Sequence, residues 1–261
     1  MNTKELLWKY QKAIQAIYEE QKLTCLSGLH NEYVINGKEI FIWHNEVTRK
    51  CAIKYGGHFH YMKNLDDILF CSDELLYFTA SLYLYRQYIN NPIEEAFRFG
   101  DGMVYPNFQN LYAKRYSMLS DVVGQKAYNY WDRIGDLIAS FFPDKIESHK
   151  VFFTTALDVI PQDFKESKNY SWLMEFKETG YKELNGKRKQ IVHYSTTETE
   201  YKYEHLKGSG NKEAMEKLQH EREALADFYK QHIALTLSGF EKTLLLLEEI
   251  SNKLFSDVVA T

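Results

Sequence analysis

The residues best suited to chemistry lie in one basic segment, residues 187–194, which reads Lys-Arg-Lys-Gln-Ile-Val-His-Tyr. Its first three residues form the densest local positive charge in the chain and would attract phosphate. His193 stands five residues after Arg188, and histidine is the side chain that most readily exchanges a proton near neutral pH. A guanidinium group and an imidazole this close in sequence suit phosphodiester chemistry.

RNA cleavage would use these two side chains without a metal ion. When the ribose 2′-hydroxyl attacks the adjacent phosphorus, one group must move a proton. Another must hold the negative charge that develops on the phosphoryl oxygens. His193 would act as the general base or acid, and Arg188 would stabilise the charge. Lys187 and Lys189 would help to place the phosphate backbone.

A helix does not bring these two side chains together by itself. At about 100° per residue, five residues of separation place Arg188 and His193 about 140° apart around a straight helix. Two arrangements would solve this problem. Either Arg188 lies at the start of the helix and reaches around it, or a second protomer completes the site. Asn185-Gly186, directly before the basic segment, favours a helix start there.

Other clusters give weaker signals. His58-Phe-His60, with His44, Cys51 and Cys71 nearby in sequence, would place two imidazoles on one face of a strand, where they could bind a metal ion. No second ligand pair has metal-site spacing, so surface or half-buried histidines are the favoured interpretation, and we expect no metal or other cofactor. The sequence contains no glycine-rich phosphate loop, no G-x-S-x-G and no H-E-x-x-H.

Two groups of charges on predicted helices are better explained by structure than by catalysis. Asp132 and Asp136 are four residues apart and would share a helix face, where carboxylates can act on protons. A solvated face or a salt link is the favoured interpretation of this pair. The run Glu221-Arg222-Glu223 is interpreted as a solvated face.

Composition indicates a globular protein with long, uninterrupted elements. The 261 residues are 44% hydrophobic and 26% charged, and they include only 4 prolines and 13 glycines. Aromatic residues reach 15%, which favours packing by large rings. The net charge of −4 excludes a globally basic nucleic-acid binder, so an RNA substrate would need a local basic patch.

Cysteine usage and hydropathy indicate a cytoplasmic protein. The three cysteines cannot all pair within one chain and show no C-x-x-C spacing, which favours free thiols in a reducing compartment. The first residues continue as an amphipathic pattern without the features of a signal peptide. No run of about 18 apolar residues occurs, so we expect no membrane association.

Hydrophobic periodicity predicts a helical bundle that would position the basic segment. The predicted helices cover residues 3–23, 66–88, 107–142, 147–160, 162–178, 184–195 and 211–255, the last with a possible bend at Gly239. Residues 32–43 are interpreted as a hairpin around Asn36-Gly37, and residues 44–65 are ambiguous. Residues 100–106 are expected to form a loop.

The basic segment resembles the R-x4-6-H motif of the HEPN superfamily, through Arg188 and His193 at the four-residue spacing. The apolar-apolar-His-aromatic ending at residues 191–194 is also similar to that family. So is the aromatic-rich segment at residues 130–135, Tyr-Trp-Asp-Arg-Ile-Gly, which is followed by Phe141-Phe142. The resemblance covers about residues 70–255. It implies an all-α, elongated HEPN-like bundle with a small N-terminal β-hairpin, in which residues 1–65 are an extension and residues 66–261 form the HEPN-like domain.

The resemblance also implies a function. The best-understood HEPN proteins are metal-independent ribonucleases of toxin–antitoxin, phage-defence and RNA-processing systems, and their sites usually form across a homodimer. Carried over, Arg188 and His193 would be catalytic, and Lys187, Lys189 and Tyr194 would bind the substrate. Asp132 would orient the catalytic pair. The expected partners are an RNA substrate, a second copy of the chain and an antitoxin protein.

One residue departs from the family pattern. Many active members carry Asn, Asp or His directly after the arginine, whereas Lys189 stands there in this chain. An ammonium group can contact phosphate but cannot accept a hydrogen bond. A non-catalytic HEPN-like module that binds RNA, a nucleotide or a protein is therefore the alternative function. A structural helical dimer, with Arg188 and His193 apart or in separate salt links, is a third.

Overall fold

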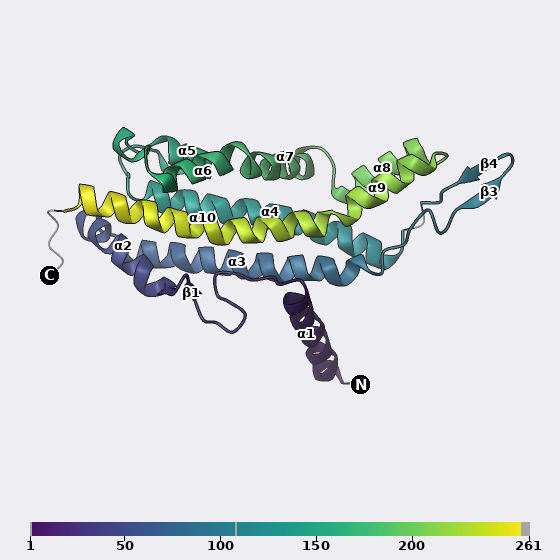
Figure 1. Ribbon diagram of the computed structural model, residues 1–261, viewed down its shortest axis with the longest axis horizontal. Coiled ribbons are helices and arrows are strands. Elements are labelled where there is room, and N and C mark those ends of the chain that lie inside the picture. The colour runs from purple at the N-terminus through teal and green to yellow at the C-terminus, as the bar shows by residue number, and fades with distance from the viewer. Residues whose placement is uncertain (1, 108, 257–261) are drawn as a thin grey trace. The chain divides into compact units, whose positions relative to one another are not determined.

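The long segments with helical periodicity fold into helices, and the fold class is all-α, as predicted (Figure 1). The computed structural model describes residues 2–107 and 109–256, except for the side chains of His58 and Phe59. The α-helices are α1 (Thr3–Glu20), α2 (Ile40–Tyr55), α3 (His58–Arg86), α4 (Leu111–Ala139), α5 (Phe153–Asp158), α6 (Lys168–Glu178), α7 (Gly180–His193), α8 (Thr197–Gly208), α9 (Lys212–Glu223) and α10 (Leu225–Leu254). Two short 3₁₀ helices are η1 (Ser148–Lys150) and η2 (Gln162–Phe164).

The predicted N-terminal hairpin is present but shorter than expected. Strands β1 (Val34–Ile35) and β2 (Lys38–Glu39) pair antiparallel around Asn36-Gly37, whose φ angles of 48° and 79° suit a tight turn. The prediction that the second strand continues to residue 43 is wrong. The carboxylate of Glu39 accepts hydrogen bonds from the backbone N–H groups of residues 41 and 42 and so caps the start of α2.

A second small hairpin replaces part of the predicted loop at residues 100–106. Strands β3 (Phe97–Phe99) and β4 (Gly102–Val104) pair antiparallel, with Phe97 opposite Val104. Gly100 adopts a φ of 61° in the turn between them, a conformation that costs glycine little. The alternation of apolar side chains in these strands is too short for periodicity to indicate a strand.

The predicted helix over residues 211–255 is two helices, α9 and α10, interrupted at Ala224. The cause is Tyr116 of α4. Its hydroxyl donates to the carbonyl groups of Arg222 and Glu223, at 3.0 and 3.2 Å, and accepts from the N–H of Ala226 at 3.2 Å. The hydroxyl therefore occupies the place where Ala226 would donate to Arg222 within a continuous helix.

The chain folds into two compact units, each made of three segments. Unit 1 comprises residues 1–23, 76–125 and 186–231, and unit 2 comprises residues 24–75, 126–185 and 232–261. Helices α3, α4, α7 and α10 contribute residues to both units. The domain boundary expected from sequence, after residue 65, falls within α3.

In unit 1, polar bonds join segments that are far apart in sequence. Asp227 of α10 accepts hydrogen bonds from the Tyr83 hydroxyl at 2.5 Å and from the Arg86 guanidinium at 2.8 Å. Helices α8 and α9 pack against each other as a helical hairpin (Figure 1). The buried His205 of α8 donates from Nε2 to the carbonyl oxygen of Tyr105 at 2.8 Å, which joins the residue that follows β4 to this helical hairpin.

In unit 2, the core forms around the fully buried indole of Trp131. The rings of Phe153 and Phe176 lie 4.9 and 4.1 Å from it, measured between ring centroids. On its other side the indole approaches the backbone of α10 at Gly239, and the neighbouring Tyr130 hydroxyl donates to the carbonyl of Thr236 at 2.9 Å. An added Cβ at Gly239 would collide with the indole ring.

None of the helices in the described part of the chain combines the length and the apolar character that a membrane span requires.

Two glycine substitutions in helices should have opposite effects on stability. Gly239→Ala should lower the free energy of unfolding by about 1–3 kcal/mol, because the new methyl group overpacks the core against Trp131. Gly186→Ala should raise it by about 0.5–1 kcal/mol, because nothing lies near its Cβ position and alanine is the better helix former. Urea denaturation measures both changes. A Gly239→Ala protein as stable as the parent would contradict the described contact.

Candidate functional site

The motif residues lie on one uninterrupted helix. Helix α7 runs from Gly180 to His193, so Arg188 is in its interior and His193 is its last residue. The predicted helix start at Asn185-Gly186 is therefore wrong. Only Thr179 separates α6 from α7, and an added Cβ at Gly180 would lie 2.7 Å from the Phe176 ring. This close approach explains why the helix begins at a glycine.

Within one chain, Arg188 and His193 face different sides of α7. Five residues of regular helix rotate the second side chain by about 140° from the first. Arg188 is half-buried, whereas His193 is exposed and Tyr194 has 84% of its surface exposed. The arrangement in which Arg188 reaches around from a helix start is excluded. Completion of the site by a second protomer stays a prediction.

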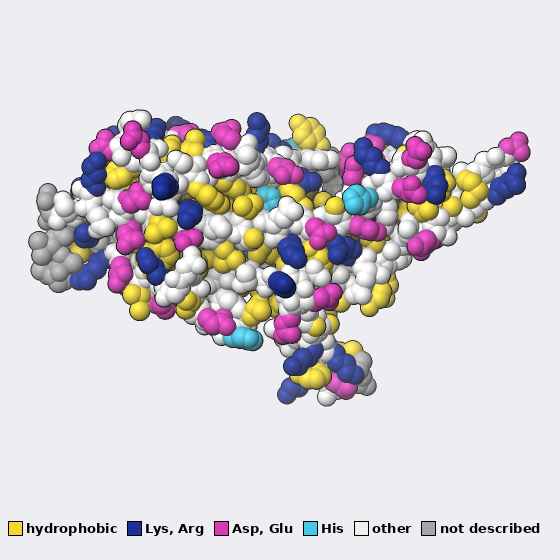
Figure 2. All heavy atoms as spheres, in the orientation of Figure 1, with side chains coloured by type: hydrophobic (Ala, Val, Ile, Leu, Met, Phe, Trp, Pro, Cys, Tyr) yellow, Lys and Arg dark blue, Asp and Glu magenta, His cyan; other side chains and the backbone are white. Residues whose placement is uncertain are grey.

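The other predicted site residues are dispersed. Lys187 is half-buried, and its ammonium lies 4.7 Å from the ring centroid of Phe228 on α10. Lys189 is exposed. Asp132 belongs to α4 in unit 2 and is half-buried, so its role as an orienting carboxylate stays a prediction. On the face shown in Figure 2, basic and acidic side chains are interspersed, in keeping with the net charge of −4.

The weaker candidates have structural partners. Asp136 forms an ion pair with Arg133 at 2.8 Å, the salt link favoured from sequence; burial raises the pKa of its carboxyl while Arg133 opposes the shift. The buried thiol of Cys51 lies 3.0 Å from the Tyr61 hydroxyl, and burial raises the pKa of this thiol. The His58 side chain lies outside the described residues. Among those described, no three His, Cys, Asp or Glu side chains gather as a metal site would require.

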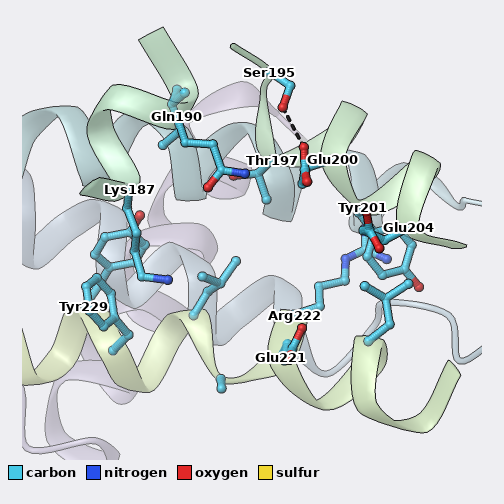
Figure 3. Close-up of a pocket in the computed structure, with 15 residues that line it drawn as sticks. Lys187, Gln190, Ser195, Thr197, Glu200, Tyr201, Glu204, Glu221, Arg222 and Tyr229 are labelled. Carbon is cyan, nitrogen blue, oxygen red and sulfur yellow. Dashed lines mark hydrogen bonds between the residues drawn. The ribbon is translucent and has the colours of Figure 1, made fainter. Parts of the chain in front are cut away.

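A pocket of about 650 Å³ borders the motif helix within unit 1 (Figure 3). Lys187 and Gln190 of α7 line one side, and Tyr201 of α8 lies across the cavity from them. Apolar side chains complete the lining: Ile191, Leu218, Leu225 and Phe228. The carboxylate of Asp121 accepts a hydrogen bond from the N–H of Thr197 at 3.1 Å and so fixes the start of α8 beside the pocket.

Arg222 is the most unusual residue of this pocket. Sequence predicted a solvated charge, but the side chain is only 4% exposed, so that prediction is wrong. Its guanidinium carbon lies 4.1 Å from the ring centroid of Tyr201, and Nη2 donates to the carbonyl of Ala113 at 3.0 Å. It forms no ion pair in the part of the chain that is described. Burying a charge without an ion-pair partner costs free energy, so a buried arginine of this kind is a candidate for binding a ligand.

A signal for this burial was present in the sequence. Met215, Gln219, Arg222 and Ala226 recur at three- and four-residue spacing, and all four are buried. In the sequence, the adjacent Glu221 and Glu223 give Arg222 the appearance of a residue on a solvated, charged face. The spacing of Arg222 from buried positions on α9 would have placed it on the inner face.

Substitutions at the exposed His193 and the buried Arg222 should differ in their effect on stability. His193→Ala should change the free energy of unfolding by no more than about 0.5 kcal/mol, because the side chain is exposed. Arg222→Ala should lower it by about 2–4 kcal/mol, because it leaves the Ala113 carbonyl without its donor and opens a gap beside Tyr201. Thermal and urea denaturation measure both. Strong destabilisation by His193→Ala would show that the imidazole is structural.

Comparison with known proteins places these features in a family. The model of the Cthe2314-like HEPN family matches residues 71–248, which is more than half of the chain and includes α7 with Arg188 and His193. Neither the comparison with curated proteins nor the comparison with solved structures found a match.

Proposed function

The chain belongs to the Cthe2314-like HEPN family, and on this basis we propose that it is a metal-independent endoribonuclease. The observation that carries the proposal is the placement of Arg188 and an exposed His193 on one helix inside the matched region. Family membership supports a nuclease-related, RNA-related or nucleotide-binding module. The arginine–histidine pair makes cleavage the more specific choice, because it supplies both a proton carrier and a charge stabiliser.

The proposed active centre is shared between two copies of the chain. Since α7 directs Arg188 and His193 to different sides, one substrate phosphate would meet Arg188 of one protomer and the partner's His193. The exposed end of α7, with His193 and Tyr194, would face the partner. Lys187 and Lys189 would hold neighbouring phosphates, and Asp132 would orient the pair.

The reaction is internal transfer at phosphorus. An imidazole takes the proton of the 2′-hydroxyl, the 2′-oxygen forms a bond to phosphorus, and the bond from phosphorus to the 5′-oxygen breaks. The same imidazole, now protonated, then gives that proton to the departing 5′-oxygen. The guanidinium of Arg188 stabilises the charge on the non-bridging oxygens through charge-assisted hydrogen bonds. The products are a 2′,3′-cyclic phosphate and a 5′-hydroxyl.

The proposal includes a biological setting. A ribonuclease of this kind would act in the cytoplasm as part of a toxin–antitoxin or phage-defence system. An antitoxin protein would inhibit it. Residues 1–65 would be an extension to the catalytic domain of residues 66–261, and the family match begins at residue 71.

A second function is favoured by a specific observation. Lys189 follows Arg188, where an acceptor would be needed to orient the reacting groups, and an ammonium group only donates. A chain with this substitution could retain RNA binding and lack cleavage. The alternative is therefore a non-catalytic module that binds RNA, a nucleotide or a protein partner.

Cleavage in the presence of excess EDTA tests the proposed chemistry. The parent protein should cut single-stranded RNA and leave 2′,3′-cyclic phosphate ends. Arg188→Ala and His193→Ala should each lower the rate by a factor of about 10² or more. Glu216→Gln, an exposed change on α9, serves as the matched control. No cleavage of several RNAs by a folded, dimeric parent would favour the binding module, whereas equal cleavage by all variants would place the active site elsewhere.

Mixing the two inactive variants tests whether the site is shared. When Arg188→Ala and His193→Ala chains form mixed dimers, one of the two sites regains both intact residues. Random exchange should then restore about a quarter of the parent rate. Gel filtration and a cleavage assay on the mixture measure the result. Activity of each variant alone, or no recovery after verified subunit exchange, would exclude a site built from one arginine and the opposite histidine.

A further inference from the structure

The pocket beside α7 combines hydrogen-bond acceptors with a buried cation. Glu200, Glu204 and Glu221 all line it. Two of them have ion-pair partners outside the pocket, since Glu204 pairs with Lys207 and Glu221 with Lys217. Glu200 has no ion pair in the described part of the chain. Its carboxylate accepts a hydrogen bond from the Ser195 hydroxyl at 2.7 Å and has capacity for more (Figure 3).

Arg222 supplies an independent indication of a ligand. Its side chain is more than nine-tenths buried, lines the pocket, and has an Nε atom with no hydrogen-bond partner among the described residues. No carboxylate neutralises its charge there. A buried donor without an acceptor is costly, so a ligand with acceptor atoms would be favoured if the Arg222 side chain turned toward the pocket on binding.

The lining also suits a flat aromatic ligand. The half-buried side chains of Phe228, Ile191 and Leu225 provide apolar surface for packing, and the buried Tyr201 and Tyr229 close the lining behind them. The cavity volume of about 650 Å³ exceeds what one base requires and leaves room for its sugar. Proteins that recognise single-stranded RNA place unstacked bases against such surfaces and bind their edges.

The position of the pocket connects it to the proposed ribonuclease site. Lys187, Gln190 and Ile191 line the pocket from α7, the helix that carries Arg188 and His193, and Ser195 follows two residues after the histidine. A nucleotide whose phosphate contacts this helix would have its base within reach of the pocket.

We infer that this pocket binds a guanine base and so determines which RNA position the protein selects. Guanine presents two adjacent donors, N1–H and the N2 amino group, which match the two oxygens of the Glu200 carboxylate. It also presents the acceptors N7 and O6, which suit a guanidinium or ammonium group. Adenine and cytosine offer only an amino group as donor, and uracil offers one N–H. The inference rests on the proposed function for its choice of RNA as the source of the base.

Equilibrium binding to the full chain tests the inference without requiring cleavage. Guanosine 5′-monophosphate should bind at least roughly tenfold more tightly than the adenosine, cytidine and uridine monophosphates. Glu200→Gln should weaken guanosine 5′-monophosphate binding at least roughly tenfold. The glutamine amide has one acceptor oxygen, whereas the carboxylate has two. The matched control is Glu216→Gln, whose side chain pairs with Lys212 and does not line the pocket.

The arms of the experiment identify the source of the base. A six-nucleotide uridine RNA with one central guanosine, compared with the same RNA carrying adenosine, should bind more tightly than the free nucleotide if RNA is the ligand. Equal affinity for both guanine ligands would assign the pocket to free nucleotide. Equal binding of all four monophosphates, no binding at millimolar concentration, or unchanged binding by Glu200→Gln would overturn the inference.

The outcome is separable from that of the ribonuclease proposal. RNA cleavage that shows no preference for guanosine would leave the ribonuclease standing and remove the guanine pocket. Selective guanine binding without any cleavage would retain the pocket and remove the ribonuclease.

Discussion

The hydroxyl group of Tyr116 is the point on which the arrangement of unit 1 depends. It takes the place of one backbone hydrogen bond, so that the chain leaves α9 and enters α10 without a proline or glycine at the break. A side chain from α4 thereby decides where α10 begins, through a hydrogen bond between residues that are 110 positions apart in the sequence. The buried hydroxyl binds three backbone groups at once, so the break does not leave these three groups unpaired.

The break has a direct effect on Arg222, which stands two residues before it. The carbonyl of Arg222 is bound by Tyr116, while its side chain turns inward to Ala113 and the ring of Tyr201. Helices α4, α8 and α9 are therefore joined around a single cation. Arg222 and Tyr201 also line one end of the pocket, so the interaction that organises the core contributes to the surface beside the motif helix.

The helices were predictable where apolar side chains recur regularly, as in α1, α4 and α10. Prediction failed where a local signal was ambiguous: residues 40–43 have the β-branched and aromatic character of a strand, yet Ile40, Trp43 and Val47 share the buried face of α2. Other features depend on contacts between distant residues. The interruption at Ala224 needs Tyr116, and the pocket needs the approach of α8, for which periodicity predicted no element. Arg188 and His193 were found from spacing, but their orientation required the full length of α7.

The continuity of α7 has a consequence for control of the protein. In the proposed shared site, a chain that carries the arginine and the histidine on different sides of one helix would hold two halves of different sites and no complete one. At concentrations well below the dissociation constant of such a dimer, the concentration of dimers, and so of complete sites, would vary with the square of the chain concentration. Such a protein would have little activity at low copy number, and its activity would rise more steeply than in proportion to the amount of chain.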